Sequence, residues 1–180
     1  TDIFAKAPAR LTAAGVSDIL GKYIALADWK IASILMDEYY CTAVADLETK
    51  AIRTVKDNLK EIAAGEKDAC EKLMYALILS GLAMQMTGNS RPASGAEHHM
   101  VHLWDMEVVN GHLDALHGEK VSAATMLVLL EYKKLADAIR RGACRVHAFT
   151  DGDRELLQET FGRKGILGAL EKENTPELLD

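Results

Sequence analysis

Histidines gather in one short stretch of this chain. Five of its six histidines lie in residues 98–117, at positions 98, 99, 102, 112 and 117. Such a local cluster is typical of a metal site, a proton relay or a polar binding face. His98 and His102 are four residues apart and share a face if they lie on a helix, while His117 lies where a loop meets the next helix. We interpret the cluster as a divalent-metal site; the alternative is a solvent-facing helix that is rich in histidine.

A catalytic metal needs a third protein ligand beside two histidines. Two imidazoles and one carboxylate form such a set and leave one position for substrate or water. The chain holds 27 acidic residues, so composition does not choose among them. Asp18 is a candidate because it follows the turn-like Gly15-Val16-Ser17 and has apolar neighbours. The alternative role of Asp18 is to stabilise the first turn of a helix capped by Ser17.

Length and composition predict one globular domain over residues 1–180, the alternative being two very small ones. The chain is 49% hydrophobic and 27% charged, with a net charge of -6, which argues against a nucleic-acid groove. Cys41, Cys70 and Cys144 are far apart and form no CxxC motif, so we expect reduced, packed thiols in a cytoplasmic protein. The longest apolar stretch, Leu73 to Met86, is too short to span a membrane, and we find no signal peptide.

The hydrophobic pattern predicts an all-α helical bundle. Apolar residues recur every three or four positions, no strand-like alternation is found, and the three prolines lie near helix edges. The helix over 67–87 is apolar on nearly all sides and is expected to be central. The expected helices cover residues 18–39, 42–64, 67–87, 92–110, 117–141 and 151–161, the second of them closed by Gly65.

Three motifs resemble a known family. Ser90-Arg91-Pro92-Ala93-Ser94-Gly95-Ala96-Glu97-His98-His99, Leu116-His117-Gly118-Glu119-Lys120-Val121 and Gly15-Val16-Ser17-Asp18-Ile19-Leu20-Gly21-Lys22-Tyr23 are similar to stretches of the sn-glycerol-1-phosphate dehydrogenases. These belong to the metal-dependent polyol dehydrogenases, with glycerol dehydrogenase and the iron-containing alcohol dehydrogenases. The resemblance covers residues from about 8 to about 130, and its first motif is the most specific.

The resemblance implies roles for individual residues. The family's divalent ion, usually zinc and alternatively nickel or iron, would be bound by Asp18, His98 and His117. Asp18 and His117 would also lie against the substrate. His102 matches the family's substrate-contacting histidine and would relay a proton in catalysis. A glycerol dehydrogenase-like pair of histidines three apart would instead use His99 with His102, and His112 and His147 match no family role.

The resemblance also implies a second domain and a reaction. The family carries NAD or NADP on an N-terminal Rossmann-like domain, but this chain has no strand pattern and no GxGxxG motif. We therefore expect residues 1–180 to be the C-terminal metal domain, which would not turn over by itself. The complete enzyme would reduce dihydroxyacetone phosphate to glycerol 1-phosphate, with the ion polarising the carbonyl. The phosphate of the substrate needs a cation; Arg91 and Lys120 lie next to the ligand motifs and are candidates for it, the alternative being that each is a solvated surface residue.

Other functions make different demands on the sequence. A glycerol dehydrogenase would use the same fold and metal residues on a substrate without phosphate. A helical metal-dependent phosphohydrolase would need a His-Asp doublet, and the chain has none. A non-catalytic interaction module would not require Asp18 to meet the histidines. The expected partners are a small-molecule substrate and, as an option, further copies of the same chain. No nucleic acid or membrane is expected.

Overall fold

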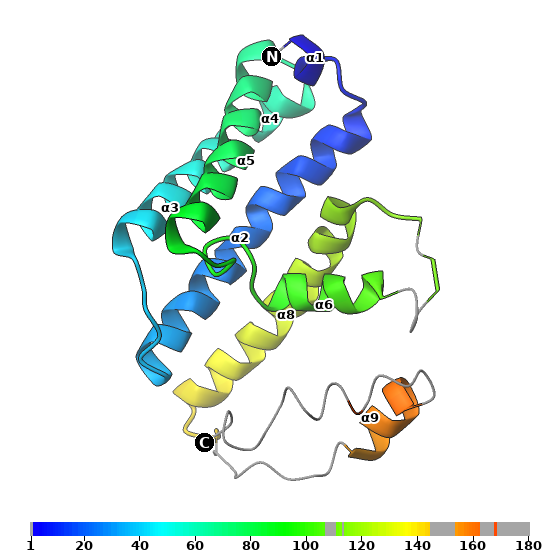
Figure 1. The fold of residues 1–180 in the computed structure, drawn as a ribbon. Coiled ribbons are helices and arrows are strands. Elements are labelled where there is room, and N and C mark those ends of the chain that lie inside the picture. Colours follow the sequence, from blue (N-terminus) through cyan, green and yellow to red (C-terminus); the bar gives the residue numbers. More distant parts are fainter. Residues whose placement is uncertain (1, 107–110, 113, 145–153, 163–167, 169–180) are drawn as a thin grey trace. The chain divides into compact units, whose positions relative to one another are not determined.

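The computed structural model describes residues 2–106, 111–112, 114–144, 154–162 and 168. All regular elements in these ranges are helices, as the hydrophobic pattern predicts (Figure 1). No helix in this part of the chain combines the length and apolarity that a membrane span requires. The helices are α1 (Asp2–Ala5), α2 (Ala9–Leu35), α3 (Thr42–Lys56), α4 (Leu59–Ala63), α5 (Lys67–Thr87), α6 (Ala96–Asp105), α8 (His117–Arg140) and α9 (Arg154–Phe161).

The chain packs as two compact units. The first contains residues 1–102 and 114–133, and the second contains residues 103–113 and 134–180. The candidate site lies wholly in the first unit. In the second unit, helix α9 exposes Leu156 and Leu157.

Helices α2, α3 and α5 enclose the main core of the first unit. Ile19 of α2, Ile52 of α3 and Leu73 of α5 are completely buried there, and short helix α4 adds Ile62. A smaller cluster surrounds Trp29 at the other end of α2. The cores are therefore made by residues at helical spacing, as binary patterning requires.

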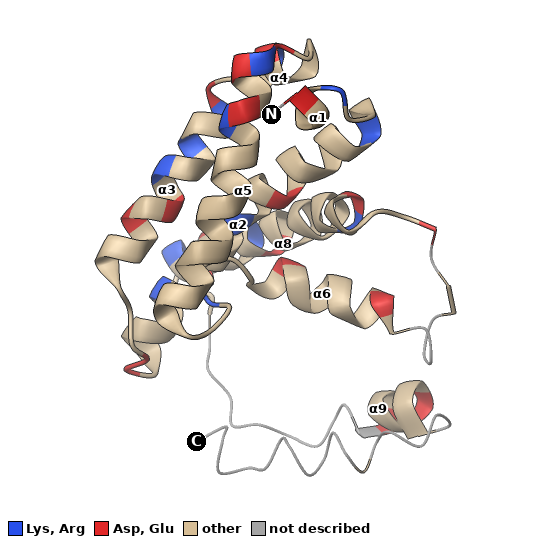
Figure 2. Cartoon of the chain, turned by 45° about the horizontal axis from the view of Figure 1, so that its top comes forward, with Lys and Arg blue, Asp and Glu red and all other residues tan. Residues whose placement is uncertain are grey.

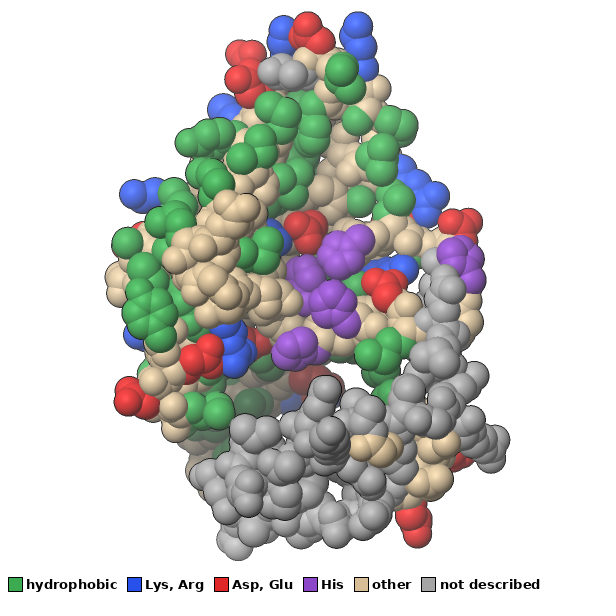
Figure 3. Space-filling view, viewed as in Figure 1, with side chains coloured by type: hydrophobic (Ala, Val, Ile, Leu, Met, Phe, Trp, Pro, Cys, Tyr) green, Lys and Arg blue, Asp and Glu red, His purple; other side chains and the backbone are tan. Residues whose placement is uncertain are grey.

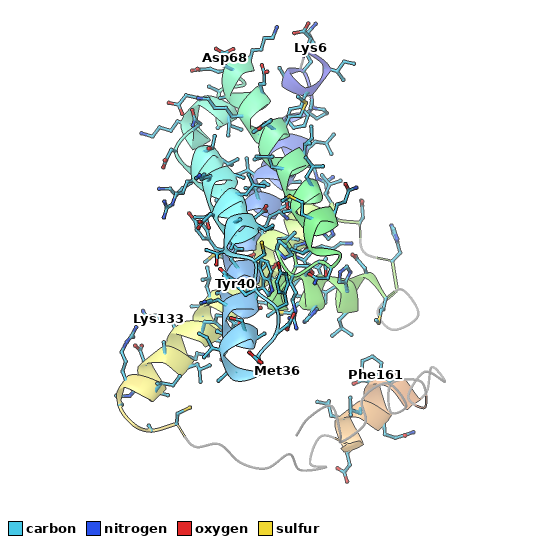
Figure 4. The ribbon with its side chains drawn as sticks, turned by 60° about the vertical axis from the view of Figure 1, so that its left-hand side comes forward. Lys6, Met36, Tyr40, Asp68, Lys133 and Phe161 are labelled. Atoms are coloured by element: carbon cyan, nitrogen blue, oxygen red, sulfur yellow. The ribbon has the colours of Figure 1, made fainter. Side chains whose placement is uncertain are left out.

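Helix α2 begins earlier and ends earlier than the expected range 18–39. It starts after Pro8, a residue suited to a helix beginning, so Ser17 does not cap it and Asp18 is not in its first turn. It ends at Leu35 because the chain reverses at Asp37, whose φ is 54°. The Trp29 indole N–H donates to the Tyr39 carbonyl at 2.8 Å. Its ring lies 4.6 Å from that of Tyr40, labelled in Figure 4.

The expected helix over 42–64 is divided into α3 and α4. Asn58 leaves the helical region, with φ −121° and ψ 21°. Its side-chain amide donates to the Thr54 carbonyl at 2.8 Å, and its oxygen accepts from Lys72 at 2.8 Å. Asparagine competes with the backbone in this way, which explains the break. Gly65, with φ 76°, follows α4 as expected.

Helix α5 has the predicted bounds, but it is not central. Its sequence carries no charge after Lys72, as the tan turns of Figure 2 show. Only one face packs on α2 and α3, through residues such as Leu73, Ala76 and Ala83. The opposite face is exposed along a stripe at helical spacing. The exposed stripe consists of Tyr75 (61%), Ile78 (53%), Leu82 (45%) and Met86 (65%).

Two glycines allow α8 to approach α2 closely. A Cβ on Gly118 would overlap the backbone carbonyl of Ala14, and a Cβ on Gly21 would lie 2.7 Å from Val121. Ala14 is one turn from Asp18 on α2, and Gly118 follows His117. The close contact therefore brings the start of α8 to the middle of α2.

An ion pair holds the same end of α8. The Arg10 guanidinium donates to both carboxylate oxygens of Glu119, at 2.6 and 2.8 Å. Glu119 also accepts the backbone N–H of Leu116 at 2.8 Å, which satisfies a donor before the first turn of α8. The hydrogen bond from Arg10, followed by that from Leu116, lowers the pKa of Glu119 to about 2.

Replacing Gly118 with alanine should destabilise the first unit. The added methyl group meets a backbone atom, which cannot rotate away, so we expect a loss of about 1–3 kcal/mol in the free energy of unfolding. Gly81→Ala is the control, because nothing lies within 4 Å of a Cβ there. Alanine at this helical position should stabilise by up to about 1 kcal/mol. Urea unfolding of both variants gives the comparison; equal effects would contradict the close contact.

Removing the Glu119 charge should change how stability depends on pH. A lowered pKa stabilises the fold above the ordinary carboxyl pKa, and this contribution is lost as pH falls toward the lowered value. Glu119→Gln should therefore be less stable than the parent chain at pH 7, and the difference should shrink steadily between pH 5 and pH 3. Thermal unfolding across this range measures it. The exposed Glu71→Gln should show no such convergence.

Candidate metal centre

Asp18 lies in the interior of α2 and faces the other elements of the site. Its side chain is 20% exposed. The Lys22 ammonium, one turn further on, donates to its Oδ2 atom at 3.0 Å and lies 3.5 Å from the Ala93 carbonyl oxygen. The side chain of Lys22 is itself 4% exposed, so the pair is shielded from water. Oδ1 of Asp18 is thereby directed away from the ammonium and toward two histidines.

The structure brings Asp18, His98 and His117 together from three helices. Nε2 of His98 lies 3.5 Å from Oδ1 of Asp18, and Nε2 of His117 lies 3.7 Å from the same oxygen. The two imidazole rings are 5.2 Å apart between centroids. One atom from each residue fits within a 4.8 Å group. Figure 3 shows the resulting purple patch of histidines beside an acidic side chain.

These distances suit a small divalent ion. Zinc ligands at about 2.0–2.1 Å in a tetrahedron stand about 3.3 Å from one another. The distances from Oδ1 to the two nitrogens exceed that value by a few tenths of an ångström, which side-chain rotation can remove. A carboxylate oxygen and two imidazole nitrogens are also the donor set of catalytic zinc sites, which keep a fourth position open. The residues therefore fit such an ion.

The electrostatics of the triad favour charged forms. Burial raises the pKa of Asp18, but the hydrogen bond with His98 and the Lys22 ammonium outweigh it and lower the pKa to about 2. Burial lowers the pKa of His98, whereas the carboxylates of Asp18 and Glu97 raise it by more, so its net shift is upward. Asp18 is thus ionised at neutral pH, and His98 would have to release a proton to bind a cation.

Two further carboxylates are buried near the triad. Glu97 on α6 is fully buried, and its Oε1 atom lies 2.7 Å from Nδ1 of His98. Glu48 on α3 is also fully buried, and burial raises its pKa. With Asp18 ionised, Lys22 is the buried cation opposing these groups among the described residues. An added divalent cation would offset the excess negative charge.

Asp28 ties together the three helices that carry the triad. It lies on α2, and its Oδ2 atom accepts the backbone N–H of Ala96, at the start of α6, at 2.7 Å. Its Oδ1 atom accepts the hydroxyl of Tyr132 on α8. Burial and the Asp28 carboxylate both raise the pKa of Tyr132, so the hydroxyl stays a donor. One aspartate thus fixes α6 and α8 to the helix of Asp18.

The other histidines lie outside the triad. His102 is exposed one turn beyond His98, with the ring centroids 6.2 Å apart, so it lies at the rim. His99 is exposed and is not part of the group, which favours His98 as the ligand of the doublet. His112 is exposed in the second unit, and His147 falls outside the described residues.

The expected phosphate contact of Arg91 is not supported. Its guanidinium donates to both oxygens of Glu38, each at 2.7 Å. The donor edge that would grip a phosphate is therefore engaged in joining the loop before α6 to the segment after α2. Lys120 lies next to the start of α8 and is half-buried. The expectation of packed thiols holds for Cys70, whereas Cys144 is exposed.

Sequence reasoning assigned no role to Lys22, Asp28 or Glu97. All three stand within or beside the motifs that carry the family resemblance. Lys22 could have been found from its position four residues after Asp18, because this spacing places both charged side chains on the same face of a helix. In the structure Lys22 and Glu97 are buried and Asp28 is half-buried.

Comparison with known proteins identifies relatives of one kind. No family model matches the chain. The glycerol-1-phosphate dehydrogenase [NAD(P)+] of Geobacillus thermodenitrificans is 35% identical, over 96% of this chain and 46% of that protein. The enzyme of the same name from Halalkalibacterium halodurans is 43% identical over 75% of this chain and 34% of its own length. That from Pyrococcus horikoshii is 36% identical over 89% and 47%.

The matches extend over most of this chain but over less than half of each of these relatives. The match to the Geobacillus thermodenitrificans protein, over 96% of this chain, includes the segments that contribute the triad. The chain therefore belongs to the glycerol-1-phosphate dehydrogenase family, as a helical segment of its members.

Proposed function

We propose that this chain is the metal- and substrate-binding part of an NAD(P)-dependent sn-glycerol-1-phosphate dehydrogenase. The observation that carries the proposal is the convergence of Asp18, His98 and His117 from three helices onto one point. The names of the relatives supply the reaction class and the dinucleotide. In the proposed complete enzyme, a nucleotide-binding domain outside this chain would bind the NADH or NADPH that donates the hydride.

Asp18, His98 and His117 would hold the ion, with zinc as the first choice and nickel or iron as alternatives. When bound, such an ion acts as a Lewis acid toward the carbonyl of dihydroxyacetone phosphate. Three protein ligands leave room for substrate oxygen. The His117 side chain is 49% exposed, so the substrate would approach beside it.

Residues of this chain would also prepare and complete the site. Lys22 occupies Oδ2 of Asp18 and leaves Oδ1 for the shared point. His102, at the exposed rim next to His98, would donate a hydrogen bond to the substrate and pass a proton to the oxygen that becomes the new hydroxyl. The positions of Lys22 and His102 and the family resemblance support these roles.

Removing a triad residue should abolish metal binding. We expect the purified chain to bind about one zinc ion, and His98→Ala, His117→Ala or Asp18→Ala to lose it, because two ligands rarely hold such an ion. The control is His99→Ala, which removes an adjacent exposed histidine. Elemental analysis after dialysis, with calorimetric titration, gives stoichiometry and affinity. Full metal content in the His98 variant, or its loss in the His99 variant, would disprove the assignment.

The complete enzyme should use a phosphorylated substrate. We expect it to reduce dihydroxyacetone phosphate with NADH or NADPH far better than it oxidises glycerol, because the phosphate supplies binding energy that orients the carbonyl. Absorbance at 340 nm measures the rate, and chiral analysis should identify glycerol 1-phosphate. Preference for glycerol, or formation of the 3-phosphate enantiomer, would assign the protein to glycerol dehydrogenase-type chemistry instead.

His102→Ala should separate catalysis from metal binding. In the complete enzyme we expect turnover to fall by about 10²–10⁴-fold, the usual contribution of a positioned acid or base. Metal content should stay near that of the parent enzyme, because His102 is not one of the triad. Equal loss of metal in His102→Ala and His98→Ala would show that the ligand and the substrate residue were exchanged.

A further inference from the structure

We propose that Glu97 is a positioning residue for the metal site, which fixes the ring of His98 so that its Nε2 atom is the metal donor. This inference rests on the proposed function, because it assigns His98 to the metal. Oε1 of Glu97 lies 2.7 Å from Nδ1 of His98, on the side of the ring opposite Nε2. The contact joins neighbouring residues whose side chains are 0% and 8% exposed.

Glu97 can act here only as a hydrogen-bond acceptor. The backbone N–H of Gly95 donates to the same Oε1 atom at 3.1 Å. Since Oε1 acts as an acceptor there, Nδ1 of the neutral imidazole supplies the hydrogen of its contact with this oxygen. Its Nε2 atom is then unprotonated and presents a lone pair. That atom is the one 3.5 Å from Oδ1 of Asp18, within the triad.

Asp18 alone would favour the opposite tautomer. A hydrogen on Nε2 could point at Oδ1 of Asp18, which would block the lone pair from a metal. The contact with Glu97 is shorter, at 2.7 Å against 3.5 Å, and Glu97 has no exposed surface at which water could compete. The geometry therefore favours hydrogen on Nδ1 before any ion binds.

The surroundings of Glu97 are poorly suited to a purely structural role. Its second oxygen, Oε2, is buried and has no hydrogen-bond partner among the described residues. A Cβ on Gly95 would lie 2.9 Å from this oxygen and 2.6 Å from Oδ2 of Asp28, so glycine is needed for both carboxylates to fit. Burying a charge with an unsatisfied oxygen costs stability that an apolar side chain would not. The cost is explained if the charge serves His98.

The charge has a chemical effect as well as a geometric one. A carboxylate on the distant ring nitrogen makes the ligating nitrogen more basic and restricts its orientation. Loss of such a partner typically lowers metal affinity by about 10- to 100-fold. Glu97→Gln keeps the shape of the side chain and removes the charge, whereas Glu97→Leu removes the acceptor too.

Nitrogen-15 NMR of the purified, metal-free chain tests the tautomer directly. At a pH where the imidazoles are neutral, His98 should carry its proton on Nδ1, and Glu97→Leu should shift it toward Nε2. Zinc titrations should then give affinities about 10- to 100-fold lower for Glu97→Gln than for the parent chain. Glu71→Gln is the control, since it removes the same charge from an exposed position on α5; its affinity should stay within about twofold of the parent chain.

The outcomes separate this inference from the metal proposal. If His98 in the parent chain carries its proton on Nε2, or if Glu97→Gln binds zinc as tightly as the parent does, Glu97 has no positioning role. If the parent chain binds no zinc, the metal proposal itself fails, whatever the tautomer. Should the Glu97 variants not fold, the tautomer of the parent chain still decides, because it requires no substitution.

Discussion

Burial of charge is the constraint on which the site depends. Asp18, Glu97 and Glu48 are carboxylates withdrawn from water, and Lys22 is the buried ammonium that faces them. If all four are ionised, two negative charges are left over, which is the charge that a divalent cation would neutralise. Without an ion, the same imbalance raises the pKa of Glu48 through burial and that of His98 through its carboxylate neighbours. Protons and a metal ion are thus alternative ways to compensate one set of buried charges.

Helix packing has to be tight for these groups to meet. Because Gly118 lies against the Ala14 carbonyl, the axis of α8 comes near enough to α2 for His117 to reach Asp18. Asp28 then joins α6 and α8 to α2 by two hydrogen bonds at a second point. Two separated attachments restrain α8 against rotation, which a single contact would allow. A ligand set spread over 100 residues of chain needs such restraint to keep its geometry.

Local pattern predicted the helices well where packing did not compete with it. The bounds of α5 and the start of α8 follow from capping and periodicity alone. The break at Asn58 and the early end of α2 did not follow, because the first depends on a side chain that bonds to the backbone and the second on the positive φ of Asp37. The exposure of the α5 stripe could not be predicted either, because a helix that is apolar on all sides does not indicate which of its faces another helix covers.

The site residues also divide into those that the sequence pattern predicted and those that it did not. His98 stands out by spacing, but Asp18 was one acidic residue among 27 until the family resemblance selected it. Asp28 acts through contacts between different helices. Glu97 acts on Nδ1 of His98, on the side of the ring opposite Nε2. Such contacts have no sequence period, so only coordinates bring them to notice. The complete burial of Glu97 then distinguishes it from the many carboxylates that lie in water.

Differences in exposure show which side of the site is open to solvent and which side is closed. Glu97 closes the far side of His98, whose side chain is 8% exposed, whereas His117 is 49% exposed and His102 is exposed at the rim. Under the proposed function, substrate and dinucleotide must therefore both approach from the side of His117 and His102. Arg91 is already bound to Glu38, so a phosphate reaching this side would need another cation. The closed side would fix the ring of His98 while the open side would meet the substrate, which separates metal affinity from substrate specificity within one small group of residues.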